Sequence, residues 1–164
     1  MNEHCNAEPS AIFSPQNEQE EYNILQRLLA ASQRKNDPRN QQEIKIQRDG
    51  ETLFSFRVRP LDEEELQQCR KNAAQLGPSP QNRMIAVETD VDVVRLRSYK
   101  IYLATVEEDK RRIWDNKAFQ IQAGILQGVE AVDTLLLAGE KDRVCNIIDG
   151  LSGFQVSLEE YAKN

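Results

Sequence analysis

The chain of 164 residues is long enough for one domain of ordinary size with terminal tails, and too short for two domains with cores of their own. Its hydrophobic fraction of 39% and charged fraction of 29% are typical of a globular protein with a polar surface, and no apolar run is long enough to span a bilayer. The formal charge of −6 argues against binding to duplex nucleic acid, and an N-terminus without signal-peptide character leads us to expect a cytoplasmic protein.

The first 42 residues are expected to hold one helix between two polar segments. Residues 1–20 contain few apolar side chains, which predicts a disordered tail. Residues 21–33 are predicted to form an amphipathic helix whose apolar face carries Tyr22, Leu25, Leu28 and Leu29. Residues 34–42 are polar, contain Pro38 and are predicted to form a linker. The helix can therefore dock on its own domain or on a partner, and its four apolar residues are the candidate partner-binding site.

An alternating pattern in residues 43–59 predicts an antiparallel β-hairpin with the apolar residues Ile44, Ile46, Phe54, Phe56 and Val58. A two-residue loop, Asp49-Gly50, would put the isoleucines and the phenylalanines on opposite faces. A three-residue loop that includes Arg48 keeps them on one face, with Ile44 opposite Phe54, so we predict that loop. An isolated hairpin is marginal, so its apolar face needs a helix or a second sheet, from this chain or from another subunit.

The segment after the hairpin is predicted to be helical. Asp62 and Glu65 form a capping box at the start of a helix over residues 62–76, which Gly77-Pro78 ends. The acidic residues 62–65 resemble a metal site, but carboxylates are favoured in the first turn of any helix, so we interpret them as structural. A further helix is predicted over residues 92–104.

Two more short helices are expected before residue 128. Thr105 and Glu108 form a second capping box, and the charges that follow favour i,i+4 ion pairs, Glu107 with Arg111 and Glu108 with Arg112. Trp114 is predicted to be a core anchor rather than a ligand platform. A stripe made of Ala118, Ile121 and Ile125 predicts the second helix.

The clearest helical pattern lies at the C-terminal end of the chain. Two runs carry apolar residues at helical spacing: Val129, Val132, Leu135 and Leu136, and then Val144, Ile147, Ile148 and Leu151. We predict that they fold back on each other as an αα-hairpin with its corner at Gly139. Gly153 is expected to end the second helix in the left-handed conformation, with Phe154 packed on the last turn. Residues 157–164 form a polar tail.

Together these elements predict a mainly α protein with a small antiparallel β-hairpin, which is an α+β fold with a helical C-terminal half. Residues 43–156 form the single globular domain, with the hairpin at 43–59 and helices up to residue 153.

The sequence offers no group of residues suited to catalysis. It has no glycine-rich phosphate loop and no nucleophile elbow, and its one histidine, His4, lies in the polar tail. Of three widely spaced cysteines, Cys69 and Cys145 fall on apolar helix faces and are predicted to be buried thiols. We therefore expect a protein that is not an enzyme, with no catalytic residues, no cofactor and no metal.

Three stretches resemble the XkdN-like phage tail assembly chaperones. The first is a string of leucines followed by Gly139-Glu140 and a helix ending in Leu151-Ser152-Gly153-Phe154. The second joins residues 104–109 to Ile113-Trp114-Asp115-Asn116, and the third is the order of hairpin and acidic helix over residues 44–76. The resemblance covers about two thirds of the chain, and it makes Trp114, Gly139, Glu140, Gly153 and Phe154 a structural signature.

The resemblance implies a chaperone that binds the tape measure protein of a phage, a prophage or a phage-tail-like particle and keeps it soluble during assembly of the tail tube. The tail tube protein and a second copy of the chain are further expected partners, whereas nucleic acid and membranes are not. Such a protein acts in the cytoplasm of the bacterial host and is not expected in the mature particle. Two alternatives stay open, a minor structural protein of a contractile tail and a non-enzymatic adaptor that binds helices.

Overall fold

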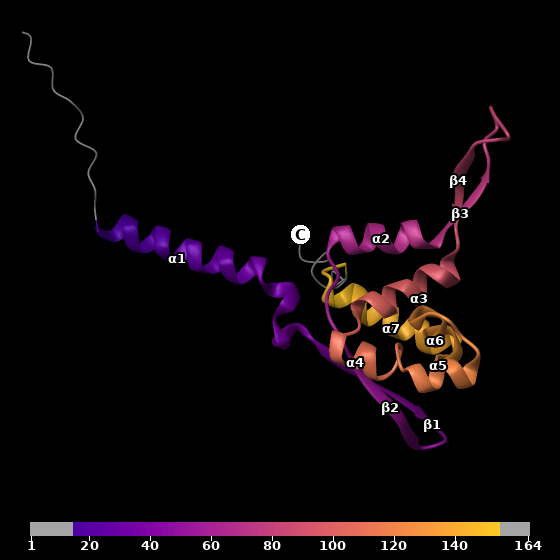
Figure 1. The fold of residues 1–164 in the computed structure, drawn as a ribbon. Coiled ribbons are helices and arrows are strands. Elements are labelled where there is room, and N and C mark those ends of the chain that lie inside the picture. Colours follow the sequence, from indigo (N-terminus) through magenta and orange to yellow (C-terminus); the bar gives the residue numbers. More distant parts are fainter. Residues whose placement is uncertain (1–14, 155–164) are drawn as a thin grey trace, which may run out of the picture. The chain divides into compact units, whose positions relative to one another are not determined.

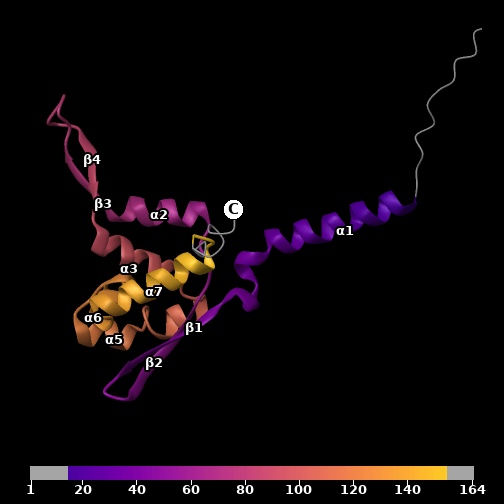
Figure 2. The same ribbon diagram turned by 180° about the vertical axis from the view of Figure 1, so that it is seen from behind.

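The computed structural model describes residues 15–154, and Figures 1 and 2 show it from opposite sides. The chain divides into two compact units, residues 1–34 and 35–164. The described part of the first unit is essentially one helix, α1 (Pro15–Ser32). The regular elements of the second unit are β1 (Gln42–Arg48), β2 (Glu51–Val58), α2 (Glu63–Ala73), β3 (Ala74–Pro78), β4 (Ala86–Val91), α3 (Val93–Ala104), α4 (Glu107–Arg112), α5 (Lys117–Ala123), α6 (Gly128–Leu135) and α7 (Ala138–Leu151). These elements confirm the predicted α+β class.

The segment before β1 is more regular than its composition predicts. α1 begins at Pro15, inside the predicted tail, and residues 1–14 of that tail lie outside the described residues, as does the predicted tail at 157–164. Two short 3-10 turns, Arg34–Asn36 and Pro38–Asn40, occupy most of the predicted linker. Asp37 caps the second turn, because its carboxylate accepts the Arg39 backbone N–H at 2.9 Å. The linker therefore has local structure of its own.

β1 and β2 form the predicted hairpin with a different loop. The loop has two residues, Asp49 (φ 53°) and Gly50 (φ 82°), both left-handed as a type I′ turn requires. Ile44 consequently faces Phe56 rather than Phe54, and Ile46 faces Phe54. A β-bulge, with Leu53 as the extra residue on β2, brings the isoleucines and the phenylalanines back to the same face of the hairpin. Without the bulge, a two-residue loop would place them on opposite faces. The predicted three-residue loop is wrong, whereas the shared apolar face is right.

Trp114 joins this hairpin to the helices of the second unit. Its side chain is fully buried, and its ring meets Phe56 edge-on at a centroid distance of 5.1 Å and Phe54 at 6.2 Å. The indole N–H donates to Thr105 Oγ1 at 2.9 Å, and the Thr105 hydroxyl donates to the Ile101 carbonyl at 2.7 Å. The prediction that Trp114 is a core anchor is confirmed.

The role predicted for Thr105 is wrong. It ends α3 instead of capping α4, whose N-cap is Val106 without a side-chain hydrogen bond. A buried indole N–H needs an acceptor, and Thr105 supplies it from a position where its hydroxyl is no longer free to cap a helix. The helix predicted over residues 92–104 is confirmed as α3, with Asp92 as its N-cap.

The outer edge of β2 is closed by residues around α4. The Arg57 carbonyl accepts the Val106 backbone N–H, and the Arg59 N–H donates to the Ala104 carbonyl, both at 2.9 Å. The Arg57 N–H donates to the buried carboxylate of Asp109 at 2.8 Å. Burial alone would raise the pKa of Asp109, but its hydrogen bonds from Arg57 outweigh burial and lower that pKa.

Only one of the two ion pairs predicted for this segment is confirmed. Glu107 accepts from Arg111 at 3.1 Å, as the i,i+4 spacing predicts. Glu108 pairs with Arg57 at 2.7 Å instead of with Arg112, which pairs with Asp109. Acidic side chains of α4 thus bind Arg57 of β2, and helical spacing alone does not indicate this contact.

A second hairpin takes the place of the predicted end of α2. The helix has the predicted capping box but ends at Ala73, and β3 follows at once and pairs antiparallel with β4. At Gly77 a Cβ would lie 2.7 Å from Thr89 Cγ2, so a larger residue there would require the Thr89 side chain to move. Both views show the β3–β4 hairpin extending away from the helices that flank it, α2 and α3.

The stripe predicted for the helix after Trp114 is also shifted. Ile121 is 81% exposed, although the pattern of Ala118, Ile121 and Ile125 placed it on the buried face. The buried residue of α5 is Gln120, whose amide donates to the Trp114 carbonyl at 3.1 Å. A polar side chain occupies the inner face here because the backbone carbonyl of Trp114 needs a donor.

The C-terminal helices α6 and α7 pack against α3 rather than on each other, so the predicted αα-hairpin, in which they fold back on each other, is wrong. The chain turns between them at Leu136 and Leu137, which are extended, so Gly139 is not the corner but lies inside α7. Leu137 is the N-cap of α7, and the Glu140 carboxylate accepts its backbone N–H at 2.7 Å. Helix α7 can start this early because Glu140 stands at the third helical position, where it completes half of a capping box.

Glu140 also ties this corner to the end of β1. Its two carboxylate oxygens accept hydrogen bonds from Arg48 at 3.2 and 2.8 Å, and Arg48 donates to the Leu135 carbonyl at 2.7 Å. The Arg48 hydrogen bonds hold the pKa of Glu140 below its ordinary value. One buried carboxylate thus links the first hairpin to the last two helices.

The burial of α7 gives a first prediction. Ile148 is fully buried, so Ile148→Ala should destabilise the fold by about 2–5 kcal/mol through lost burial and the cavity left behind. The matched control is Ile121→Ala, which removes the same atoms from an exposed helical position and should leave stability nearly unchanged. Urea unfolding followed by circular dichroism measures both, and equal losses would contradict the core described above.

The Glu140 link gives a second prediction, because Glu130 plays the same capping part at α6 with hydrogen bonds from backbone N–H groups and none from an arginine. Glu140→Ala should lower Tm at pH 7 more than Glu130→Ala does. The folded-state pKa is depressed for both carboxyls, for Glu140 chiefly by the Arg48 hydrogen bonds and for Glu130 chiefly by backbone N–H groups. The stabilisation that Arg48 adds is therefore present above the ordinary glutamate value of about 4.3 and shrinks as pH falls through the folded-state pKa of Glu140. Thermal melts from pH 7 to pH 3 test this, and an excess independent of pH would refute the electrostatic link.

Candidate partner-binding surface and family signature

The candidate partner-binding residues lie on α1, in the first unit. Tyr22, Leu25, Leu28 and Leu29 recur at three- and four-residue spacing, and their exposed fractions are 57%, 51%, 62% and 46%. Polar residues such as Asn23 and Arg27 lie on the other side of the helix. Within the described part of its own unit, α1 has nothing to pack against. An isolated helix of this kind is marginal in water, and burial of its apolar face against any surface would stabilise it.

The predicted signature residues in the second unit have structural roles. Trp114 is the core anchor, Glu140 links the corner of α7 to Arg48, and Gly139 lies in the first turn of α7. Gly153 has a φ of +90°, and the Gly153 and Phe154 N–H groups donate to the carbonyls of Gly150 and Asp149, which makes a Schellman motif. The left-handed helix end is confirmed. Phe154 itself remains 60% exposed and borders a groove with Leu66 and Leu96.

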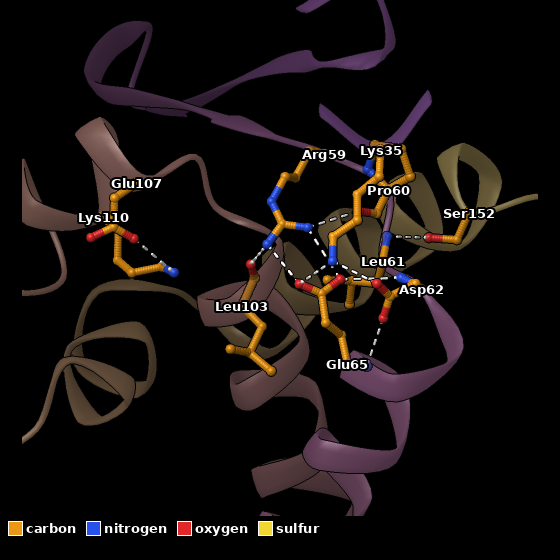
Figure 3. Close-up of polar contacts among 10 residues, drawn as sticks. All are labelled: Lys35, Arg59, Pro60, Leu61, Asp62, Glu65, Leu103, Glu107, Lys110 and Ser152. Atoms are coloured by element: carbon orange, nitrogen blue, oxygen red, sulfur yellow. Dashed lines mark hydrogen bonds and ion pairs between the residues drawn. The ribbon is translucent and has the colours of Figure 1, made fainter. Parts of the chain in front are cut away.

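The acidic start of α2 is occupied by basic side chains, as Figure 3 shows. Lys35 Nζ lies 2.6 Å from Asp62 and 3.1 Å from Glu65, and Arg59 donates to Glu65 at 2.8 Å. Ser152, just after α7, accepts the Leu61 backbone N–H at 3.0 Å beside them. These carboxylates neutralise lysine and arginine, and no group of three or more metal-binding side chains is found within residues 15–154.

A second polar cluster, which sequence patterns do not reveal, joins three helices. Ser98 on α3 lies 2.5 Å from Asp133 on α6 and accepts from Lys141 on α7 at 3.2 Å, and Lys141 pairs with Asp133. Serine beside lysine is a nucleophile–base pairing in some hydrolases, but Ser98 is fully buried, so no substrate can reach it. The cluster instead satisfies a buried lysine between packed helices.

The two cysteines in the described range are buried, as predicted. Exposed fractions of 0% for Cys69 and 6% for Cys145 put them in the protein interior. Burial raises the pKa of each thiol to about 11, so both are protonated at neutral pH and unsuited to nucleophilic chemistry. Cys5 and His4 lie outside the described residues. No helix within residues 15–154 has the length and hydropathy to cross a membrane.

Comparison with known families gives one match. The model of the phage XkdN-like tail assembly chaperone proteins matches residues 25–164, which include the C-terminal part of α1, residues 25–32, and all of the second unit. Leu25, Leu28 and Leu29 fall within the matched range and Tyr22 does not. No curated protein and no solved structure matches the chain. Since the matched range covers far more than half of the chain and includes every signature residue described above, this protein belongs to the XkdN-like phage tail assembly chaperones.

Proposed function

We propose that this chain binds the tape measure protein of its phage, prophage or phage-tail-like particle and keeps that protein soluble until the tail tube forms around it. The observation that carries the proposal is the exposed apolar face of α1, made of Tyr22, Leu25, Leu28 and Leu29. The chain belongs to a family of tail assembly chaperones, so the partner of this face would be a protein that takes part in tail assembly.

The physical properties of α1 suit a helical partner. Its 18 residues span about 27 Å, enough for an apolar stripe to cover several turns of another helix. A tape measure protein is long and exposes apolar helical stretches before the tube covers it, so masking those stretches opposes aggregation. The net charge of −6 adds repulsion between complexes and favours solubility.

The remaining parts of the proposal follow from this role. The structured segment that starts at Lys35 belongs to the second unit, where Lys35 pairs with Asp62, so the short connection before it would be the joint that lets α1 reach a partner. Binding without chemistry is sufficient for this function, which therefore requires no enzyme activity. The protein would act in the host cytoplasm, contact the tail tube protein as assembly proceeds, and leave before the particle matures.

The test is co-expression with the tape measure protein encoded in the same genome. The wild-type chain should raise the soluble fraction of the tape measure protein and co-purify with it. Leu25→Asp combined with Leu28→Asp should abolish co-purification while the circular dichroism spectrum and Tm of the second unit survive, because charge on the apolar face prevents helix packing.

The matched control is Gln19→Asp combined with Asn23→Asp, which adds the same charge to the polar side of the same helix and should keep binding intact. A wild-type chain that neither co-purifies with the tape measure protein nor raises its solubility would overturn the proposal. Recovery of the chain from purified particles would instead favour a minor structural protein, and capture of an unrelated host helix would favour an adaptor.

A further inference from the structure

Strand β1 has one edge without a neighbour. In the described residues its sheet has two strands, and β1 pairs only with β2. The Arg57 N–H and C=O groups point away from β1, since they bond to Asp109 and Val106. Arg57 lies opposite Glu43, so the backbone groups of Glu43, and of Lys45 two residues on, point outward from the free edge of β1. Unpaired strand edges of this kind accept another strand.

A groove runs along this free edge. It has a volume of about 350 Å³ and lies between β1 and α7. Its lining combines the apolar residues Ile44, Ile46, Val144 and Ile147 with the polar residues Lys45, Gln47, Glu140 and Arg143. A second hollow of similar volume continues it toward the end of α7, lined in part by Ile147 and Leu151. An added strand would therefore gain backbone hydrogen bonds from β1 and apolar contacts from the groove.

We propose that the strand that occupies this edge is β1 of a second copy of the chain, paired antiparallel about a two-fold axis at Ile44. In that register the Glu43 of each copy lies directly opposite the Lys45 of the other, and their outward backbone groups form two hydrogen-bonded pairs. Both side chains are about half exposed and lie on the face opposite the isoleucines, where they contact each other at 3.6 Å within one chain. Glu43 and Lys45 can therefore give up their ion pair within one chain and pair with Lys45 and Glu43 of the other copy.

The charges select this register over its neighbours. An axis at Lys45 would set two lysines against each other, and an axis at Glu43 would do the same with two glutamates, both destabilising in directly opposed positions. Only the axis at Ile44 makes the strand complementary to itself, with Ile44 beside its copy on the core face. The two hairpins then form one four-stranded sheet, which is more stable than an isolated two-stranded hairpin. This self-association is independent of tape measure binding.

Charge reversal tests the register through the oligomeric state, measured by sedimentation over a concentration series. The wild type should dimerise. Glu43→Lys and Lys45→Glu should each raise the dimer Kd roughly tenfold, because two like-charged pairs replace two opposite ones. The double variant Glu43→Lys/Lys45→Glu should dimerise like the wild type.

The decisive arm mixes the two single variants. The Glu43→Lys chain carries two lysines at these positions and the Lys45→Glu chain carries two glutamates, so the two chains are complementary. An equimolar mixture should form heterodimers although neither variant dimerises well alone. Circular dichroism and Tm of each variant control for folding. Leu25→Asp with Leu28→Asp should leave the dimer intact, since α1 is not in this interface.

Two outcomes overturn the proposal. One is a wild-type chain that stays monomeric over the whole concentration series. The other is a dimer that responds neither to the single charge reversals nor to mixing, which would place the contact between copies elsewhere. Either result leaves the tape measure experiment unaffected, because that experiment tests a different surface.

Discussion

The buried indole of Trp114 is the contact on which the second unit depends. Its ring packs against Phe54 and Phe56 of the first hairpin, while its N–H donates to Thr105, where α3 ends. A two-stranded hairpin cannot persist alone in water, and helices α6 and α7 need a common surface to pack on. Trp114 stabilises the hairpin because it covers the hairpin's apolar face. It also connects the hairpin to the helices, because it lies in the same core as Ile101, Val132 and Ile148.

Around that contact, polar links help to fix the positions of α4 and α7 relative to the first hairpin. Asp109 holds the outer edge of β2, and Glu140 with Arg48 fixes the corner before α7 to the end of β1. In both cases a mostly buried carboxylate accepts hydrogen bonds both from a backbone N–H and from an arginine side chain. Such bonds are directional, so they determine where a helix begins relative to a strand, which hydrophobic burial alone does not specify.

The periodic parts of the fold are predictable from the sequence, and the parts set by tertiary contacts are not. The faces of α6 and α7, the capping box of α2 and the left-handed Gly153 follow from local rules. Local patterns do not predict the β3–β4 hairpin, although Val87, Thr89 and Val91 alternate as in a strand, because residues 74–76 continue the helical pattern of α2. Thr105, Gln120 and Ser98 serve buried partners distant in the sequence, and no local pattern indicates them. The apolar face of α1 is predictable from helical period alone, whereas its exposure is not, because the same pattern fits docking on the chain's own domain or on a partner.

The β-bulge at Leu53 has a consequence for how the hairpin tolerates changes in length. Leu53 is the extra residue opposite β1, so its deletion would leave a regular ladder with Ile46 still facing Phe54 and Ile44 still facing Phe56. Deletion of Ser55 would instead place the two phenylalanines next to each other and turn one of them away from Trp114. An alignment of related chains should accordingly show gaps at position 53 and an uninterrupted strand from residue 54 to residue 58.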